Sequence, residues 1–425
     1  MPALRKTTPS PLHVFAHTDA GFERAGMLDL SNAPSGDFNA VFSYDAAYVV
    51  SRSGFALDPL NLPLSTTRRA TDSKYVGLGV LFDAAPDAWG RRVIAAHTQQ
   101  AASSISEDTA LRLGRGNTVG ALVFSETESL AENAIAPISS YPNLDDLQAA
   151  AQAVRNVETG TANDALAQEL LAGSWSIGGA RPKSLIAHEG ALWIAKFATA
   201  NEAFDRQRAE WACLRMARDM DFGVPEHALA HTSLGSVLLV KRFDRHSSAD
   251  GDENLRRHYI SAASLVSAQP QSKRLDTPFD MATFSYANLG DIAALVCQQP
   301  QQARNEVFGR MLLNILLHNT DDHLKNHGFL RMQGSLTKYE LAPVFDISPQ
   351  ASGLHFLHIG ASGRTGSLAA ALQDARSYGL TRSGAQAIAD KLQNVFSQRS
   401  AYWDAAGISA DGVRQIEAVL GMRKD

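Results

Sequence analysis

The spacing of apolar residues predicts mainly strands in the first half of the chain and helices in the second. Residues 40–50 (AVFSYDAAYVV) and 118–124 (TVGALVF) are rich in strand-forming side chains, so we expect a strand in each. Residues 80–98 begin near a Pro-Asp pair and continue with an amphipathic, helical spacing. The polar, proline-bearing residues 126–143 are typical of a surface connection.

The middle of the chain predicts a hairpin, a helix and a further strand. Residues 183–197 (KSLIAHEGALWIAKF) hold two strand-forming runs around a His-Glu-Gly turn. A helix is expected over 207–223, because Gly223 with Pro225 just beyond it is a usual stop signal. Residues 234–245 (LGSVLLVKRFDR) predict the next strand.

After about residue 250 the predicted elements are helices. They are expected over 291–299, 303–319 and 367–375, with two more after residue 384. In the second of these helices apolar residues recur at helical spacing, which indicates a central place in its own core. We therefore expect an α+β fold with a β-rich N-terminal half, an all-helical C-terminal lobe and a cleft between them.

Composition narrows the class of protein. The chain has 425 residues, of which 45% are hydrophobic and 20% charged, values typical of a soluble protein with at least two cores. No apolar run approaches the ~18 residues that span a bilayer, and the amino terminus lacks the apolar core of a signal peptide. Cys213 and Cys297 lie far apart without metal-type spacing, so we expect both reduced. These features predict a cytoplasmic protein with no membrane partner.

The charge balance argues against a large nucleic-acid interface. Lys and Arg total 39 against 44 for Asp and Glu, a net charge of −5. Proteins that bind nucleic acid over a wide surface are usually basic. Direct DNA contact by this chain is therefore not expected from its composition.

The segment NTDDHLKN, residues 319–326, carries the most informative chemistry. Asp321 and Asn326 have the D-x-x-x-x-N spacing of catalytic loops that transfer a phosphoryl group from ATP. In such loops the Asp accepts the proton of the attacking hydroxyl and the Asn oxygen holds a metal ion. Asp and Asn are common loop residues, so the spacing gains its value only from its surroundings.

Three further residues complete a candidate ATP site. Lys196 ends an apolar strand, where its ammonium could reach phosphates, and Glu210 follows on the next helix, where it could pair with that ammonium. Asp346 follows a predicted hairpin over 327–342, which places a carboxylate beyond the catalytic loop. Because Mg²⁺ prefers hard oxygen ligands, Asp346 with Asn326 would suit it.

The segment SIGGARPK, residues 176–183, is a weaker phosphate-binding candidate. Gly178 and Gly179 permit a close approach of the backbone to phosphates, and Arg181 and Lys183 add positive charge. The segment is not a Walker A sequence, and an ordinary glycine turn is the alternative.

A transition-metal hydrolase is a second alternative. His323 and His327 are four positions apart, a spacing that suits a metal on one face of a helix. The glutamate of an H-E-x-x-H motif is missing, however.

The segments SIGGARPK, WIAKF, LLVKRFDR, NTDDHLKNHGF and APVFDISP together resemble the HipA family of bacterial serine/threonine kinases, the toxins of persistence-related toxin–antitoxin pairs. The resemblance covers most of the chain, since LFDAAPDAWGRRVI and LGRGNTVGALVF are similar to the family's amino-terminal subdomain. It implies a bilobal, protein-kinase-like fold. The implied parts are an N-terminal subdomain (1–120), a kinase N-lobe with a phosphate-binding loop (121–245) and a C-lobe with the catalytic loop (246–425).

The resemblance also implies roles for single residues. Asp321 would be the catalytic base, and Asn326 and Asp346 would bind Mg²⁺. Ser176 would be autophosphorylated, and its added negative charge would repel ATP phosphates and inactivate the enzyme. The predicted ATP-binding residues are Lys196, Glu210, Gly178, Gly179 and His323, with backbone groups of Lys241 and Phe243 facing the adenine.

One departure from the family concerns the base. The family often has Gly after the catalytic Asp, where this chain has Asp322. The choice between the two carboxylates therefore stays open, although the spacing to Asn326 favours Asp321.

The resemblance implies an ATP- and Mg²⁺-dependent protein serine/threonine kinase whose target could be an aminoacyl-tRNA synthetase. Its expected partners are a protein substrate and a HipB-like helix-turn-helix antitoxin, with DNA bound only through that antitoxin. Two alternatives are a small-molecule kinase and a catalytically vestigial corepressor that binds antitoxin and operator. The presence of Lys196, Asp321, Asn326 and Asp346 together argues against a vestigial site.

Overall fold

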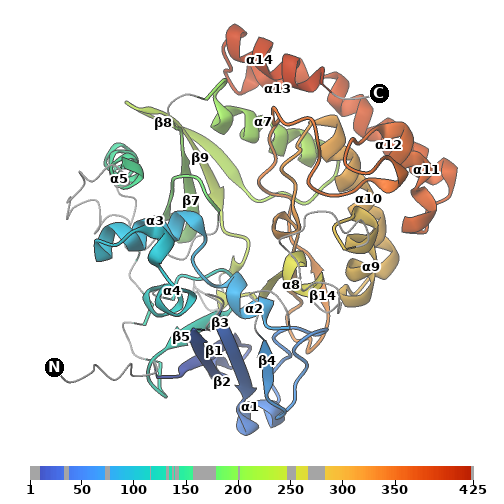
Figure 1. The fold of residues 1–425 in the computed structure, drawn as a ribbon. Helices are drawn as coiled ribbons and strands as arrows, with labels where there is room; N and C mark the ends of the chain where they lie inside the picture. The colour runs from blue at the N-terminus through green and yellow to red at the C-terminus, as the bar shows by residue number, and fades with distance from the viewer. Residues whose placement is uncertain are drawn as a thin grey trace.

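The computed structural model combines two β-sheets, whose strands end at Lys241, with a mainly helical part after them (Figure 1). It describes residues 10–32, 38–71, 77–114, 116–130, 134–135, 138, 143–156, 179–199, 202–246, 255–266 and 283–422. Across these residues, no helix combines the length and the apolar character needed to cross a membrane.

The N-terminal sheet is antiparallel and has five strands in the order β4-β3-β2-β1-β5. Its strands are β1 (Leu12–Thr18), β2 (Gly21–Asn32), β3 (Phe38–Tyr44), β4 (Arg69–Thr71) and β5 (Leu122–Ser125). Alternate side chains such as Val14, Leu28 and Phe42 are buried in the main core. The strand expected over 40–50 stops at Tyr44, because Asp45 begins the short helix α1 (Ala46–Val50).

Helices connect this sheet to the next. The single helix expected over 80–98 is two helices, α2 (Gly79–Asp83) and α3 (Ala88–Thr98), with Pro86 in the break between them. Ser106 caps α4 (Glu107–Leu113) by accepting a hydrogen bond from the N–H of Thr109. Helix α5 (Leu144–Asn156) follows after a connection that lies partly outside the described residues.

The second sheet is also antiparallel, in the order β6-β7-β9-β8, and helices cover both its faces. Its strands are β6 (Lys183–His188), β7 (Ala191–Phe197), β8 (His227–Thr232) and β9 (Gly235–Lys241), so the expected hairpin over 183–197 is confirmed. Trp193 and Val237 pack with α3 and α5, while Leu238 and Val240 join the main core with α7 (Arg206–Asp219). The sheet therefore holds β7 rigidly between two layers.

The second half is organised around α10 (Pro300–Leu316), whose last ten residues are all buried. Within the described residues that follow β9, the other helices are α8 (Ala262–Val266), α9 (Tyr286–Val296), α11 (Leu368–Gln373), α12 (Arg382–Ser397), α13 (Arg399–Ala405) and α14 (Ala410–Leu420). Short 3-10 turns lie at η5 (Leu324–Asn326), η6 (Gly360–Ser362) and η7 (Ala375–Tyr378). In Figure 1 the helices from α9 to α14 form the right side and top of the molecule.

The expectation of an all-helical C-terminal lobe needs one correction. A three-stranded sheet of β12 (Tyr259–Ser261), β13 (Gly328–Arg331) and β14 (Tyr339–Leu341) lies inside it, and β10 (Arg245–His246) pairs with β11 (Leu255–Arg256). The hairpin expected over 327–342 pairs with β12, a strand too short to stand out in the sequence. At Gly328 a Cβ atom would lie 2.1 Å from the Tyr259 ring, so only glycine allows the two strands to approach.

The division of the chain at residues 120 and 245 stays a prediction. The pairing of β5 with β1 shows that the first sheet itself continues to Ser125, past the first of these positions.

Candidate active site

Three charged side chains meet where the second sheet faces the helical half. Lys196 lies near the end of β7, and its Nζ donates to Glu210 Oε1 on α7 at 2.6 Å. The same ammonium donates to Asp346 Oδ1 at 2.9 Å. Lys196 and Glu210 are mostly buried, whereas half of the Asp346 side chain is exposed. The sequence placed these residues in one site, and the structure brings all three into contact.

The ionisation of this group follows from burial and mutual attraction. Burial alone would lower the pKa of Lys196, but Asp346 and Glu210 outweigh it and raise that pKa. The Lys196 ammonium holds the pKa of the Asp346 carboxyl well below its usual range. Burial raises the pKa of Glu210, and Lys196 offsets this only in part. Lys196 is therefore a fixed positive charge near neutral pH.

A second lysine lies beside the first. Lys183 faces Lys196 across the β6–β7 ladder and is buried. Burial, with the charge of Lys196 as the next cause, lowers the pKa of Lys183 to about 8. The sequence assigned Lys183 only to a weak phosphate-binding motif, but the structure places two ammonium groups at this sheet edge.

The backbone of Asp346 is in an unusual conformation. Its φ angle is +58°, in the left-handed region that costs a non-glycine residue of the order of 1 kcal/mol or more. The preceding residue, Phe345, packs its ring 5.5 Å from that of Phe243. Strain of this kind persists where the surroundings fix it, and here it presents the carboxylate to Lys196.

The catalytic-loop segment leaves α10 and separates its two adjacent carboxylates. Asp321 is exposed, whereas Asp322 is buried. Asp322 Oδ2 accepts hydrogen bonds from Tyr286 Oη at 2.5 Å, Asn314 Nδ2 at 2.7 Å and His327 Nε2 at 2.8 Å. Burial alone would raise the pKa of Asp322, but His327 and these bonds outweigh it and lower the pKa. Asp322 thus anchors the loop to α9 and α10, and Asp321 is the exposed carboxylate of the pair.

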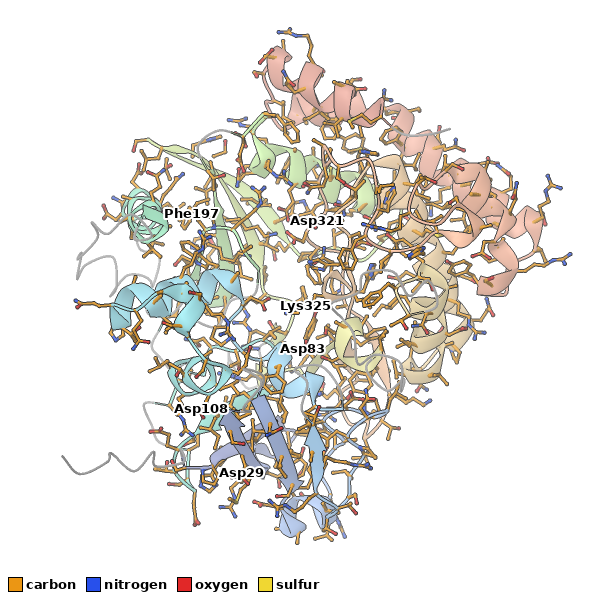
Figure 2. The ribbon with its side chains drawn as sticks, in the orientation of Figure 1. Asp29, Asp83, Asp108, Phe197, Asp321 and Lys325 are labelled. Carbon is orange, nitrogen blue, oxygen red and sulfur yellow. The ribbon has the colours of Figure 1, made fainter. Side chains whose placement is uncertain are left out.

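Asn326 closes the same segment. Its Nδ2 donates to the backbone carbonyl of Asp321 at 3.3 Å, and its N–H donates to the His323 carbonyl at 2.8 Å. The side chain is buried, and its amide nitrogen faces the loop, which leaves Oδ1 as its ligand atom for a cation. An amide oxygen here and the Asp346 carboxylate are the hard donors that fit Mg²⁺. Figure 2 places Asp321 and Lys325, of the same loop, near the centre of the molecule.

The transition-metal alternative loses its geometric basis. His323 and His327 do not share a helix face, because η5 ends at Asn326 and His327 leads into β13. His327 Nε2 is already bonded to Asp322. The His323 ring lies against Phe356 at 5.8 Å, so its assignment to ATP binding rests on its position in the loop alone.

The predicted adenine-facing segment begins at Lys241, the last residue of β9. The N–H of Lys241 donates to the Glu226 carbonyl at 2.8 Å, so this group is used inside the sheet. The Phe243 ring packs against Tyr259 and Phe345. The other backbone groups of Lys241 and Phe243 stay predicted adenine contacts.

The phosphate-binding segment is described from Gly179 onward; Ser176 and Gly178 lie outside the described residues. Gly179 has a φ angle of +98°, a backbone conformation that residues with a side chain rarely adopt, so glycine is strongly favoured at this position. Arg181 forms an ion pair with Glu202.

A comparison with models of known protein families shows to which family the chain belongs. The model of the HipA-like C-terminal domain matches residues 175–399, more than half of the chain, and that range contains every candidate residue above. The chain belongs to the HipA family.

A sequence comparison and a structural comparison both find similarity to HipA proteins. The serine/threonine-protein kinase toxin HipA of Shewanella oneidensis (strain MR-1) is 25% identical over 145 residues. That alignment spans 32% of this chain and about a third (33%) of the relative. A chain of the Shewanella oneidensis MR-1 complex of HipA, HipB and operator DNA has a TM-score of 0.68 at 18% identity, over 97% of this chain and 95% of its own. The bilobal, kinase-like HipA fold is thereby confirmed.

Sequence reasoning missed several residues that hold this HipA-type site together. Tyr286 and Asn314 fix Asp322, and Asp87 of the N-terminal part bonds both Lys325 and Gly179. Asp87 and Lys325 are 238 positions apart, so no local pattern links them. The only available signal was the Pro-Asp pair before α3, which predicted a helix start.

Proposed function

We propose that this chain is an ATP- and Mg²⁺-dependent protein serine/threonine kinase of HipA type. The observation that carries the proposal is the Lys196–Glu210–Asp346 contact in a chain whose exposed Asp321 precedes a buried Asn326. Phosphoryl transfer needs positioning and charge neutralisation more than covalent chemistry by the protein. This set of residues supplies both.

In the proposed reaction the hydroxyl oxygen of a Ser or Thr bonds to the γ-phosphorus while the bond from that phosphorus to the bridging oxygen breaks. Asp321 takes the hydroxyl proton, and ADP leaves with the bond's electron pair. Lys196, aimed by Glu210, binds the phosphate oxygens. Asn326 and Asp346 would hold Mg²⁺, which when bound neutralises phosphate charge.

Regulation and partners are proposed by the same family relationship. Phosphorylation of Ser176 would inactivate the enzyme, since negative charge in the phosphate-binding segment repels ATP. The neighbouring structure is a complex of HipA with HipB and operator DNA, which supports a HipB-like antitoxin as partner, with DNA bound through it. The chain itself would be cytoplasmic, and its protein target could be an aminoacyl-tRNA synthetase.

Label from γ-phosphate-labelled ATP should be transferred to a cellular protein in the presence of Mg²⁺, and to Ser176 of the chain itself. The purified protein would be incubated with lysate, with and without EDTA, and the labelled residues mapped by mass spectrometry. EDTA should abolish transfer, because the phosphate charges then lack their cation. Label found only in small molecules would favour the small-molecule kinase, and no transfer with intact antitoxin and operator binding would favour the corepressor.

Lys196→Met should lower kcat/KM for ATP by about 10²–10³-fold, the order of loss seen when one preorganised donor to developing charge is removed. The variant also leaves Glu210 and Asp346 facing each other without their shared cation. Steady-state kinetics would measure the loss. Lys391→Met is the matched control, since Lys391 pairs with Asp221 at the surface and should leave kcat/KM unchanged. Equal activity of the two variants would contradict the role of Lys196.

A further inference from the structure

One carboxylate from the N-terminal part of the chain reaches two loops of the proposed kinase site. Asp87 lies directly before α3, and its Oδ2 accepts the backbone N–H of Gly179 at 3.1 Å. Its Oδ1 accepts from Lys325 Nζ at 2.8 Å. Gly179 belongs to the phosphate-binding segment, and Lys325 lies between Asp321 and Asn326 in the catalytic loop. A single side chain therefore joins the two segments that must face each other across ATP.

The contact is reinforced by the residue two positions later. The N–H of Trp89 donates to the Gly179 carbonyl at 2.9 Å, and its indole Nε1 donates to the Lys183 carbonyl at 2.8 Å. Trp89 is fully buried in the core between α3 and the second sheet. Gly179 is thus held at both its N–H and its carbonyl, and the end of the segment cannot shift without breaking several bonds at once.

Lys325 connects this arrangement to the catalytic loop. It lies in the turn η5, whose last residue is the proposed metal ligand Asn326. Both Asp87 and Lys325 are about a quarter exposed, so their ion pair contributes little to overall stability. Its effect is geometric, because it fixes where the catalytic turn lies relative to Gly179.

We propose that Asp87 is a positioning residue of the kinase site: it sets the spacing of the phosphate-binding and catalytic loops, and so makes phosphoryl transfer depend on the N-terminal part. This inference rests on the proposed kinase function. Asp87 touches neither ATP nor the reacting hydroxyl in this scheme. It acts through Gly179 and Lys325.

The two arms of Asp87 can be tested separately. Asp87→Ala removes both acceptors, whereas Asp87→Asn keeps an oxygen for the Gly179 N–H but loses the charge that holds Lys325. Asp87→Ala should lower kcat/KM for ATP by about 10–100-fold, the order of loss from a misplacement of about 1 Å. Asp87→Asn should lower kcat/KM for ATP by a smaller factor than Asp87→Ala. In a Lys325→Gln background Asp87→Asn should have no further effect, because the arm it weakens is already missing, while Asp87→Ala should still lower the rate.

A structural readout accompanies the kinetics. Amide hydrogen exchange of the peptide that contains Gly179 should speed up in Asp87→Ala, because its N–H loses its acceptor. Asp108→Ala is the matched control: this α4 carboxylate binds Arg112 and lies away from the site in Figure 2. It should change neither the exchange at Gly179 nor kcat/KM, and melting temperatures should match for all variants with measurable activity.

The outcomes are decisive in both directions. The proposal is supported if Asp87→Ala lowers kcat/KM more than Asp87→Asn does, and if Asp87→Asn lowers kcat/KM no further when Lys325→Gln is already present. Wild-type kinetics in Asp87→Ala, or equal losses for Asp87→Asn in both backgrounds, would overturn it. If the wild-type protein transfers no phosphate, the proposed function fails, and exchange at Gly179 alone then supports or overturns the bridge.

Discussion

Replacing Asp321 with Asn should lower kcat for phosphoryl transfer by about 10²–10⁴-fold, the usual contribution of a positioned general base. The melting temperature should stay at the wild-type value, because the Asp321 side chain is exposed. The amide cannot accept a proton, but it keeps the shape of the carboxylate. Initial rates with saturating ATP and Mg²⁺, together with calorimetry, would measure both effects.

The neighbouring carboxylate supplies the control. We expect Asp322→Asn to lower the stability of the folded protein, whereas Asp321→Asn should lower kcat and leave stability unchanged. Asp322 accepts three hydrogen bonds in the interior, from Tyr286, Asn314 and His327. Its loss should lower the free energy of unfolding by about 1–3 kcal/mol, the cost of leaving buried donors without their charged acceptor. If instead Asp322→Asn were as stable as the wild type and lost all transfer, the base would be Asp322, and the assignment of Asp321 would be wrong.

The candidate site was predictable from sequence where its residues follow local rules. Lys196 ends an apolar strand, and Glu210 lies 14 positions later on a helix with a clear stop signal, so we expected the two side chains to pair where the helix packs on the sheet. The structure brings them together at 2.6 Å. Asp346 also contacts Lys196, but its positive φ was invisible, because no pattern of letters marks a non-glycine residue in the left-handed region.

The choice between the paired carboxylates depended on burial, which the sequence does not contain. Asp321 and Asp322 are neighbours of the same type, and only the tertiary fold sends one to solvent and the other to Tyr286, 36 positions away. The same reason hides Asp87, whose partners lie 92 and 238 positions along the chain. Polar contacts of this range have no periodicity to reveal them.

The fold was predictable in its long, periodic elements and less so in its short ones. The hairpin over 183–197 was predictable from two strand-forming runs around a turn, and the helix α10 from apolar residues that recur at helical spacing over many positions. The break between α2 and α3 and the strand β12 were missed, since a three-residue strand and a four-residue gap are too short to carry a pattern.

Asp244 supports the segment after β9, and its replacement by Asn should cause the largest loss of stability. The carboxylate is buried and accepts hydrogen bonds from Arg242 at 2.6 and 2.9 Å, from Arg245 at 2.8 Å and from the Gly120 N–H at 2.7 Å. Without the Asp244 carboxylate, the buried guanidinium groups of Arg242 and Arg245 lose the negative charge that they share. The free energy of unfolding should fall by about 3–5 kcal/mol, as when one partner of a buried ion pair is removed. Urea denaturation at neutral pH would measure the change.

The pH dependence of the Asp244→Asn variant tests whether the loss of stability comes from the missing negative charge. Burial alone would raise the pKa of Asp244, but Arg242 and Arg245 outweigh it and hold that pKa well below its usual range. A carboxyl with a depressed folded pKa contributes its full stability above the unfolded pKa of about 3.9 and loses it as the pH falls further. The gap between wild type and Asp244→Asn should therefore stay constant from neutral pH to about pH 5 and narrow below about pH 4. Asp29→Asn, which removes an exposed carboxylate 3.7 Å from Arg68, should change the unfolding free energy by no more than about 1 kcal/mol. A gap that did not narrow in acid would mean that Asp244 acts by shape and not by charge.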